Sequence, residues 1–561
     1  MEFERLANVF KNLEDKSERL VKVDILSKFI LEIDKDSIKE TFMLIGGNIF
    51  YPWEDKDTEI AEKLTIKALS IATGYDKQYI ENLFVKTGDM GLVAEKLVLE
   101  KKQRSIFTKK LSIKDVYDTF RSIGLLGGEG AQDKKIRYLA NLFVSSTPLE
   151  ARYIARLSLE DLKIGVGEGI IIDSIAKAFN FRSEDIEKAY FILNDFGEVV
   201  KLILEKGSEA IYNISPILGR PIKVMLAIKA DSAKEAFDVV GRPAMIEYKY
   251  DGFRVQIHKK GNEISLWTRR LENVTDQFPD VIEFIKECLP MDKDFLVEGE
   301  IVGYHDRKYL PFQKISQRIR RKYNIEKMVK EIPVVVRLFD IIYYDNSLLN
   351  VPFKERRDLL KSIVKEDENK ISVSEGKITD SEEEANNFFN DAIRNGLEGI
   401  MFKKLDAKYQ PGRRVGYMVK LKPVKESIDV VITGAEWGEG KRGGWLTSYI
   451  ISILDRETGK LLEVGEVSSG LKEKKESEDD ITFEDMTKIL KPLIREEDGK
   501  MVKIIPKIVI EVLYDEIQKS PKYSSGFALR FPRFVRLRPD KSIEDIDDIN
   551  RLYDLYRNQK S

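Results

Sequence analysis

A lone lysine lies between two acids in the stretch EYKYDGFR (247–254). Apolar residues precede the stretch, alternating apolar residues follow it, and Asp251-Gly252 is a turn signal. Lys249 is therefore predicted at the point where a strand ends and the chain reverses. Taken alone, the pattern favours a solvated charge on a hairpin. Any chemistry at Lys249 depends on the groups that the rest of the chain brings to it.

Further charged and aromatic side chains stand at or near predicted strands. They are Arg269 in TRRLEN, two carboxylates closing the strand of VEGEIVG (297–303), Phe339 beside Asp340 in RLFDIIYYD, Glu398 entering the strand of LEGIMFKK, and Lys420 and Lys422 on one face of YMVKLKP. Each alone fits an edge charge or a core aromatic. Together with Lys249 they suit a nucleotide held between an aromatic plane, metal-binding acids and phosphate-binding cations.

The common nucleotide-binding loops do not explain this collection. No G-x-x-x-x-G-K-[ST] occurs in the sequence, which argues against a P-loop. GEGKRG (438–443) matches G-x-G-x-x-G, but the residues after it predict a strand, whereas a dinucleotide site needs a helix there. This segment is instead predicted to be a mobile, cationic loop between two strands of a barrel.

Three regions with different patterns of apolar residues must position these side chains. Residues 1–214 repeat apolar residues at helical spacing and predict a helical domain. The segment SPILGRPIKVMLA (215–227), called the linker below, opens a predicted α+β domain with antiparallel strands that runs from 215 to 425. From 426 to 561 short strands dominate, and they predict an all-β barrel such as an OB-fold.

The composition narrows the class of protein. The chain has 94 Lys and Arg against 96 Asp and Glu, yet basic runs mixed with apolar residues (101–110, 314–322 and 530–541) favour a polyanionic partner. One cysteine excludes internal disulfides and Cys-rich zinc sites, and with only His258 and His305 histidine chemistry is not expected. Lys and Glu enrichment is compatible with a thermophilic source. No apolar run approaches the roughly 18 residues of a membrane helix, and the N-terminus does not resemble a secretory signal, so a cytoplasmic protein without membrane contact is expected.

The order of the motifs resembles that of the covalent nucleotidyltransferases. K-x-D-G-x-R (Lys249 to Arg254), E-G-E (298–300), E-G-I-M (398–401) and K-L-K (420–422) follow one another as in that family. The helical N-terminal region and a final R-x-D-K (Arg538 to Lys541) resemble ATP-dependent DNA ligases of the archaeal and eukaryotic type, over essentially the whole chain. The resemblance implies an enzyme that seals nicks in duplex DNA during replication, repair and recombination.

The resemblance also implies a mechanism. Lys249 would attack the α-phosphorus of ATP and form lysyl-AMP, the AMP would pass to the 5′-phosphate of a nick, and the 3′-hydroxyl would then displace it. Only a neutral amine is a nucleophile, so neighbouring cations (Arg254, Lys420, Lys422) and Mg²⁺ are expected to lower the pKa of Lys249.

Roles for the other matching side chains follow from the same family. The implied set is an adenine contact for Phe339, ribose or phosphate contacts for Arg254 and Arg269, ribose and metal contacts for Glu300 and Glu398, and phosphate contacts for Arg414, Lys420 and Lys422. Glu247 would oppose the lowering of the Lys249 pKa, so it is expected to face the adenine instead. Arg538 and Lys541 are expected to neutralise the departing pyrophosphate, although phosphate contact with DNA also fits them. Oxygen ligands of this kind suit Mg²⁺ or Mn²⁺.

Partners are implied as well. The helical domain of a nucleoid-associated monomer would grip nicked double-stranded DNA across the minor groove, mainly through phosphates and therefore in a salt-sensitive way. QRSIF (Gln103 to Phe107) resembles the peptide that plugs into sliding clamps of the PCNA type, although a basic helix end facing DNA fits nearly as well.

Rival functions remain open at this point. An RNA-capping guanylyltransferase shares the lysine motif, and an RNA ligase or a catalytically silent DNA-binding scaffold is also compatible with parts of the pattern. The long helical extension before Lys249 favours a DNA ligase over the first two, and the intact lysine motif argues against the scaffold. NAD-dependent DNA ligases carry a four-cysteine zinc site, which a single cysteine excludes.

Overall fold

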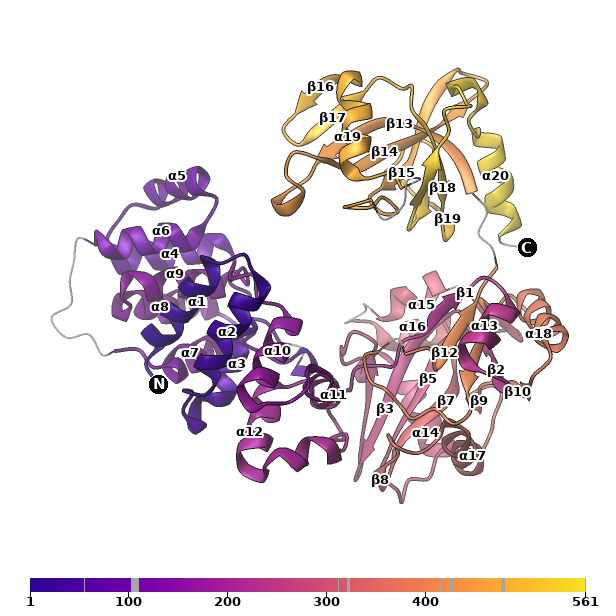
Figure 1. Ribbon diagram of the computed structural model, residues 1–561, viewed down its shortest axis with the longest axis horizontal. Coiled ribbons are helices and arrows are strands. Elements are labelled where there is room, and N and C mark those ends of the chain that lie inside the picture. The colour runs from indigo at the N-terminus through magenta and orange to yellow at the C-terminus, as the bar shows by residue number, and fades with distance from the viewer. Residues whose placement is uncertain are drawn as a thin grey trace. The chain divides into compact units, whose positions relative to one another are not determined.

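The protein is described here by a computed structural model that covers residues 1–54, 56–101, 110–310, 312–319, 323–413, 415–423, 427–475 and 480–559. The chain forms two compact units, Met1–Lys422 and Pro423–Ser561, and the first of them holds a helical region and a mixed α/β region (Figure 1). The predicted order of a helical, a mixed and a β-rich region is confirmed. Within the described ranges, no helix has the length and apolar character needed to cross a bilayer.

Helices make up the first region. They are α1 (Phe3–Glu14), α2 (Arg19–Ile30), α3 (Ile38–Ile45), α4 (Glu62–Thr73), α5 (Lys77–Thr87), α6 (Met90–Leu99), α7 (Ile113–Leu125), α8 (Ala131–Ser145), α9 (Pro148–Ser158), α10 (Glu168–Phe179), α11 (Ser183–Leu193) and α12 (Phe196–Lys206). In α1 the apolar residues Phe3, Leu6, Ala7, Phe10 and Leu13 recur at helical spacing, and all are buried. Most of the helices contribute to one shared apolar core.

Two sheets form the mixed region. The first has the strand order β1 (Ile228–Ala230), β12 (Met418–Leu421), β11 (Gly399–Lys404), β2 (Ala244–Lys249), β10 (Gly376–Thr379). The second has the order β4 (Glu263–Thr268), β3 (Phe253–Lys260), β5 (Phe295–His305), β7 (Val334–Tyr344), β8 (Asn346–Ser347), with β6 (Lys308–Leu310) on β5 and β9 (Ile371–Val373) on β7. The pairings are antiparallel, as predicted, except those of β1 with β12 and of β7 with β9.

Each sheet packs against helices, and the core around the first sheet also includes Val302 and Val335 of the second. The helices α13 (Ala233–Val240) and α18 (Glu382–Arg394) pack on the first sheet. The second core includes residues of α14 (Pro279–Cys288), α15 (Phe312–Ile319), α16 (Ile325–Glu331) and α17 (Phe353–Ile363). Ile246, Ile400 and Phe402 of the first sheet face its helices, so Glu247 and Lys249 project from the opposite face.

The turn after Lys249 does not make a hairpin. Strand β2 ends at Lys249 as predicted, but β3 belongs to the second sheet, because both edges of β2 are already paired with β10 and β11. Gly252 lies tightly against β5 in this crossing, since a Cβ there would stand 2.2 Å from the Ile301 carbonyl oxygen. The predicted chain reversal is therefore replaced by a crossing from one sheet to the other.

The second unit is β-rich. Its strands are β13 (Ser427–Trp437), β14 (Leu446–Asp455), β15 (Lys460–Val467), β16 (Ile494–Asp498), β17 (Met501–Ile504), β18 (Val509–Leu513), β19 (Glu516–Lys519), β20 (Phe527–Arg530) and β21 (Arg533–Leu537). The order β15-β14-β13-β17-β16 forms one sheet, in which β18 also pairs with β13 and with β21. The GEGKRG segment lies between β13 and β14, as predicted.

This unit is not all-β as the sequence predicted. Two helices, α19 (Phe483–Leu490) and α20 (Ile549–Asn558), accompany the strands. A capping box between Thr482 and Asp485 starts α19, and its residues Phe483, Met486 and Leu490 are buried in the core of the unit. The 3.6-residue apolar period of these short segments was hidden among the strand patterns around them.

Candidate active site

Lys249 stands among acids and a second lysine. Its amine forms an ion pair with Glu398, the residue just before β11. Glu398 also accepts a hydrogen bond of 2.7 Å from Lys422 Nζ, and its backbone N–H donates to the Lys249 carbonyl at 2.9 Å. The side chains of Lys249, Glu398 and Lys422 are each about a quarter exposed, at 22–28%. The Lys249 amine is thus held in place yet reachable from solvent.

Strand register explains why these side chains meet. Strand β11 runs antiparallel to β2, with Met401 opposite Glu247, and antiparallel to β12, with Met401 opposite Lys420. Residues directly opposite in a sheet project their side chains from the same face. Glu247, Lys420 and, two residues from Glu247, Lys249 therefore share one face of the first sheet.

The second sheet contributes Arg254 and Glu300. These residues lie opposite one another on β3 and β5. Arg254 also forms an ion pair with Glu298, whose side chain is fully buried. The two acids of VEGEIVG were predicted at a strand end, but β5 continues to His305, so they project from the middle of a central strand.

The acids dominate the electrostatics of Lys249. Burial raises the pKa of Glu300 to about 7, although Lys249 and Arg254 oppose this shift. Burial alone would lower the pKa of Lys249, but Glu398 and Glu300 outweigh it and raise the pKa above its ordinary value. The expected depression of this pKa is therefore not found, because the acids beside the amine outweigh its burial.

The aromatic ring of Phe339 lies beside this cluster, in contact with Arg254 and Lys403. The β5–β7 pairing shifts register between Glu298 opposite Asp340 and Gly299 opposite Leu338, which leaves Phe339 as the extra residue of a bulge. Arg254 and Lys403 lie over its half-buried ring, with the guanidinium carbon 5.2 Å and Nζ 4.7 Å from the ring centroid.

Glu247 is linked to the Phe339 ring through Lys403, which contacts both. Its buried carboxylate forms ion pairs with Lys403 at 2.5 Å and with Arg357 at 3.1 Å. Lys403 and Arg357 were not among the predicted site residues. A signal for Lys403 was present, because it follows Met401 at strand period two in LEGIMFKK and so falls on the face of Glu247.

The contacts described for this cluster do not include four of the predicted residues. Arg269 is exposed, one residue beyond β4. Arg414 lies outside the described residues. Arg538 and Lys541 belong to the second unit, where both form ion pairs with Asp429, at 3.0 and 2.7 Å.

The acids fit a divalent cation that is shared with a substrate. Across the described ranges, no group of three or more His, Cys, Asp or Glu side chains is arranged to hold a metal ion by itself. Glu300 and Glu398, which both act on Lys249, offer two carboxylates. Mg²⁺ commonly takes one or two carboxylates and completes its shell with phosphate oxygens and water.

Comparisons with known proteins agree with this geometry. Three family models match the chain: DNA ligase N terminus over residues 2–176, ATP dependent DNA ligase domain over 224–422, and ATP dependent DNA ligase C terminal region over 442–541. Together they span most of the chain, and the middle match contains Lys249 and its acids.

Similar proteins extend over the full length. A DNA ligase of Nanoarchaeum equitans is 55% identical, over 100% of this chain and 99% of that protein. A DNA ligase of Thermococcus fumicolans is 44% identical, over 99% and 98%. The solved structure named "Pmar-Lig_PreS3" shares the fold with a TM-score of 0.55 at 18% identity, covering 95% of this chain and 99% of that one. The chain therefore belongs to the ATP-dependent DNA ligases.

Proposed function

We propose that the enzyme seals nicks in duplex DNA, in replication, repair and recombination, through AMP bound covalently to Lys249. The observation that carries the proposal is the ion pair of Lys249 with Glu398, beside the Phe339 ring and the buried Glu247. One nucleophile, two acids and an aromatic plane on adjoining sheets suit the α-phosphate and the base of one nucleotide. The archaeal relatives favour DNA over the RNA ligase and guanylyltransferase alternatives.

In the first step Lys249 Nζ forms a bond to the α-phosphorus as the bond to pyrophosphate breaks. The amine must lose its proton beforehand, and Glu398 and Glu300 oppose that loss because they raise the pKa of Lys249. A Mg²⁺ or Mn²⁺ ion bound by Glu300, Glu398 and phosphate oxygens would supply positive charge that lowers the pKa of Lys249 and stabilises the phosphates.

The remaining side chains position the nucleotide. Phe339 stacks on adenine, and Glu247 accepts a hydrogen bond from it while Lys403 and Arg357 fix the carboxylate. Arg254 and Arg269 bind ribose or phosphate. Lys420, Lys422 and Arg414 bind phosphate oxygens, which places the reacting atoms in line.

The last two steps transfer and release AMP. The 5′-phosphate of the nick attacks the AMP phosphorus, the N–P bond to Lys249 breaks, and the amine is regenerated. The 3′-hydroxyl then attacks the 5′-phosphate and AMP leaves. Because all three steps are displacements at phosphorus, catalysis is mainly positioning and stabilisation of charge.

Three domains would carry out this work, with boundaries at 1–214, 215–425 and 426–561. The helical domain grips nicked duplex through phosphates across the minor groove, and the C-terminal domain is an OB-fold that completes the grip as a monomer encircles the nick. The basic runs near 101–110 and 530–541 support DNA contact from the helical domain and from the C-terminal domain. The enzyme acts in the cytoplasm, at the nucleoid.

Intact mass spectrometry tests the function directly. Incubation with ATP and Mg²⁺ is expected to increase the protein mass by one AMP, and addition of nicked duplex should then discharge it with sealing of the strand. GTP is the matched comparison, because a capping-type guanylyltransferase would take up GMP in preference. A protein that acquires no nucleotide, or that seals only RNA, would contradict the proposal.

The clamp hypothesis concerns Gln103 to Phe107, which lies outside the described residues. We propose that this segment binds a sliding clamp of the PCNA type, and that replacing Ile106 and Phe107 with alanine weakens clamp-stimulated ligation. Basal ligation should be spared. Ligation assays with and without clamp check this, and unchanged stimulation would favour the alternative, a basic segment that faces DNA.

A further inference from the structure

The linker main chain is bound by alternate side chains of β3. Gln256 Nε2 donates to the Ile222 carbonyl at 2.7 Å, and its Oε1 accepts from the Ile222 N–H at 3.0 Å. Two residues further on, His258 Nδ1 accepts from the Gly219 N–H at 3.2 Å, and its Nε2 lies 3.3 Å from Gln256 Oε1. A backbone N–H can only donate, so the ring proton belongs on Nε2 and points at Gln256.

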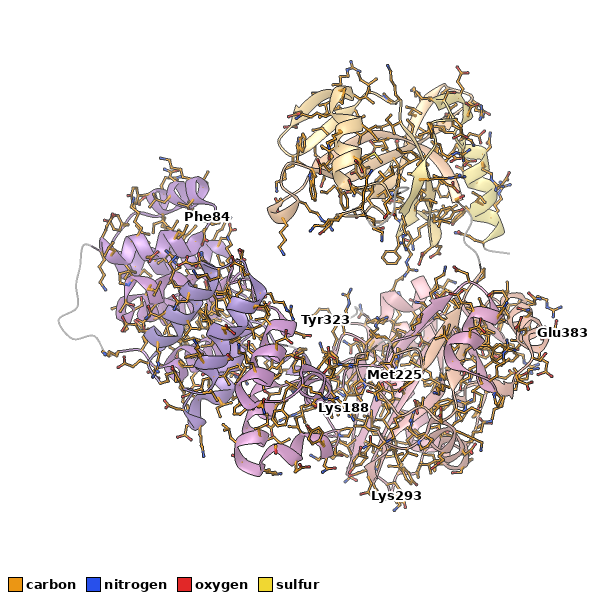
Figure 2. The ribbon with its side chains drawn as sticks, in the orientation of Figure 1. Phe84, Lys188, Met225, Lys293, Tyr323 and Glu383 are labelled. Atoms are coloured by element: carbon orange, nitrogen blue, oxygen red, sulfur yellow. The ribbon has the colours of Figure 1, made fainter. Side chains whose placement is uncertain are left out.

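The same side chains converge on Glu298. Its carboxylate accepts hydrogen bonds from Gln256 Nε2 at 3.3 Å, from the Tyr409 hydroxyl at 2.8 Å, and from Arg254. Tyr409 also reaches the linker, because its hydroxyl accepts from the Met225 N–H at 3.1 Å. Arg254 donates to the Met225 carbonyl at 2.8 Å; Figure 2 labels Met225.

This chain of polar contacts is buried. Gln256 and His258 are each 1% exposed and Glu298 is fully buried. A buried carboxylate is tolerated only while its hydrogen-bond donors are in place, and removal of one donor leaves it free to shift. Burial also lowers the pKa of His258 to about 3, so the ring stays neutral and keeps its acceptor for Gly219.

This series of hydrogen bonds ends at the proposed nucleotide site. Arg254 lies opposite Glu300 on β5, and its guanidinium stands over Phe339, 5.2 Å from the ring centroid. Its position is set by the Glu298 carboxylate and by the Met225 carbonyl. A shift of Glu298 or of the linker would therefore move a side chain that faces the nucleotide.

We propose that Gln256 and Tyr409, with His258 behind Gln256, are positioning residues for self-adenylation. They bind the linker main chain and hold Glu298, and through Glu298 they fix Arg254 in the nucleotide site. The inference rests on the proposed formation of lysyl-AMP at Lys249.

The linker is bound on its other side by the helical region. Asn194 Nδ2 donates to the Pro221 carbonyl at 2.6 Å, and the Lys223 N–H donates to the Phe191 carbonyl at 2.9 Å. The segment that connects the helical region to the first sheet thus contacts both the helical region and Arg254. The site side binds main-chain groups of Gly219, Ile222 and Met225, whereas the helical side binds those of Pro221 and Lys223.

Two variants of the full-length enzyme test the proposal. Gln256→Met keeps the side-chain volume but removes its hydrogen bonds, and Tyr409→Phe removes only a hydroxyl. In single-turnover self-adenylation without DNA, each is expected to raise the half-saturating ATP concentration about tenfold. Thermal melts show that each variant is folded. Normal ATP dependence in two folded variants would overturn the proposal.

A double-mutant cycle separates positioning from general packing. If Gln256 acts through Arg254, then in an Arg254→Lys background the Gln256→Met change should raise the half-saturating ATP concentration less than about twofold further. A full tenfold increase in that background would mean that Gln256 acts independently of Arg254, which would refute the inference.

Asn194→Gly is the matched control. It removes a linker hydrogen bond on the helical side, and glycine tolerates the left-handed backbone of Asn194 (φ 51°). Self-adenylation should stay at the wild-type level, and an effect as large as that of Gln256→Met would show that any loosening of the linker suffices. Loss of AMP uptake by the wild-type protein would instead contradict the proposed function itself.

Discussion

The Lys249→Ala variant is expected to take up no AMP from ATP and to seal no nick, while its affinity for nicked duplex stays close to that of the wild type. Alanine has no atom that can form the bond to phosphorus. Among the described residues, no other lysine both ends strand β2 and forms an ion pair with Glu398. Loss of covalent catalysis should lower the rate by several orders of magnitude.

Mass spectrometry after incubation with ATP and Mg²⁺ checks this expectation, and a nick-binding assay shows that the DNA-binding surfaces are intact. Lys260→Ala is the matched control, because Lys260 is exposed at the other end of the adjoining strand β3 and should adenylate normally. AMP attachment to Lys249→Ala at the wild-type level would refute the assignment of the nucleophile.

The short-range part of this site was predictable from the sequence. A turn signal after an apolar run placed Lys249 at the end of a strand, and the two-residue period of YMVKLKP placed Lys420 and Lys422 on one face. Both inferences need only neighbouring residues, because side chains alternate along any strand. The position of Glu398 before a strand followed from the same local pattern.

The long-range part was not predictable from one sequence. Phe339 faces the site through a bulge, which depends on the pairing of two strands that are far apart in the chain. The partners of Glu247, which are Lys403 and Arg357, come from a strand and a helix whose contact is set by the packing of both sheets. Local patterns carry no information about such register.

His258 illustrates the limit differently. The small number of histidines in the sequence argued only against histidine chemistry. In the structure the His258 ring is buried and neutral, and it contacts Gln256. The alternation of RVQIH predicted a strand correctly, but it could not show that Arg254, Gln256 and His258 face the linker. That face is defined by a segment with no regular structure of its own.

A second large loss of self-adenylation is expected from substitutions near the C-terminus. Arg538→Ala and Lys541→Ala should each cripple self-adenylation but leave intact the sealing of a nick that already carries 5′-AMP. Pyrophosphate is the leaving group of the first step and carries several negative charges, so two cations that neutralise it and hold it in line with Lys249 would act in that step alone. Once pyrophosphate has left, the second unit would be free to present another face to DNA.

The contacts within the second unit fit a transient role. Asp429 forms ion pairs with both cations, and Arg538 also pairs with Asp540. Asp429 is largely buried at the start of β13, so it holds the two side chains ready when no phosphate is bound. A group of cations that is already neutralised by acids gains little from DNA phosphates, whereas the concentrated charge of pyrophosphate competes better for it.

Arg536 provides the matched control for this prediction. It lies on β21, two residues before Arg538, and its exposed side chain pairs with Glu511. If the basic run simply contacts DNA throughout the reaction, then Arg536→Ala, Arg538→Ala and Lys541→Ala should all slow single-turnover sealing of pre-adenylated DNA to similar extents. If Arg538 and Lys541 serve pyrophosphate, only their variants should lose AMP uptake, and their sealing of pre-adenylated nicks should match that of the wild type. Losses in that sealing step as large as those in self-adenylation would reject the transient role, because pyrophosphate has already left by then.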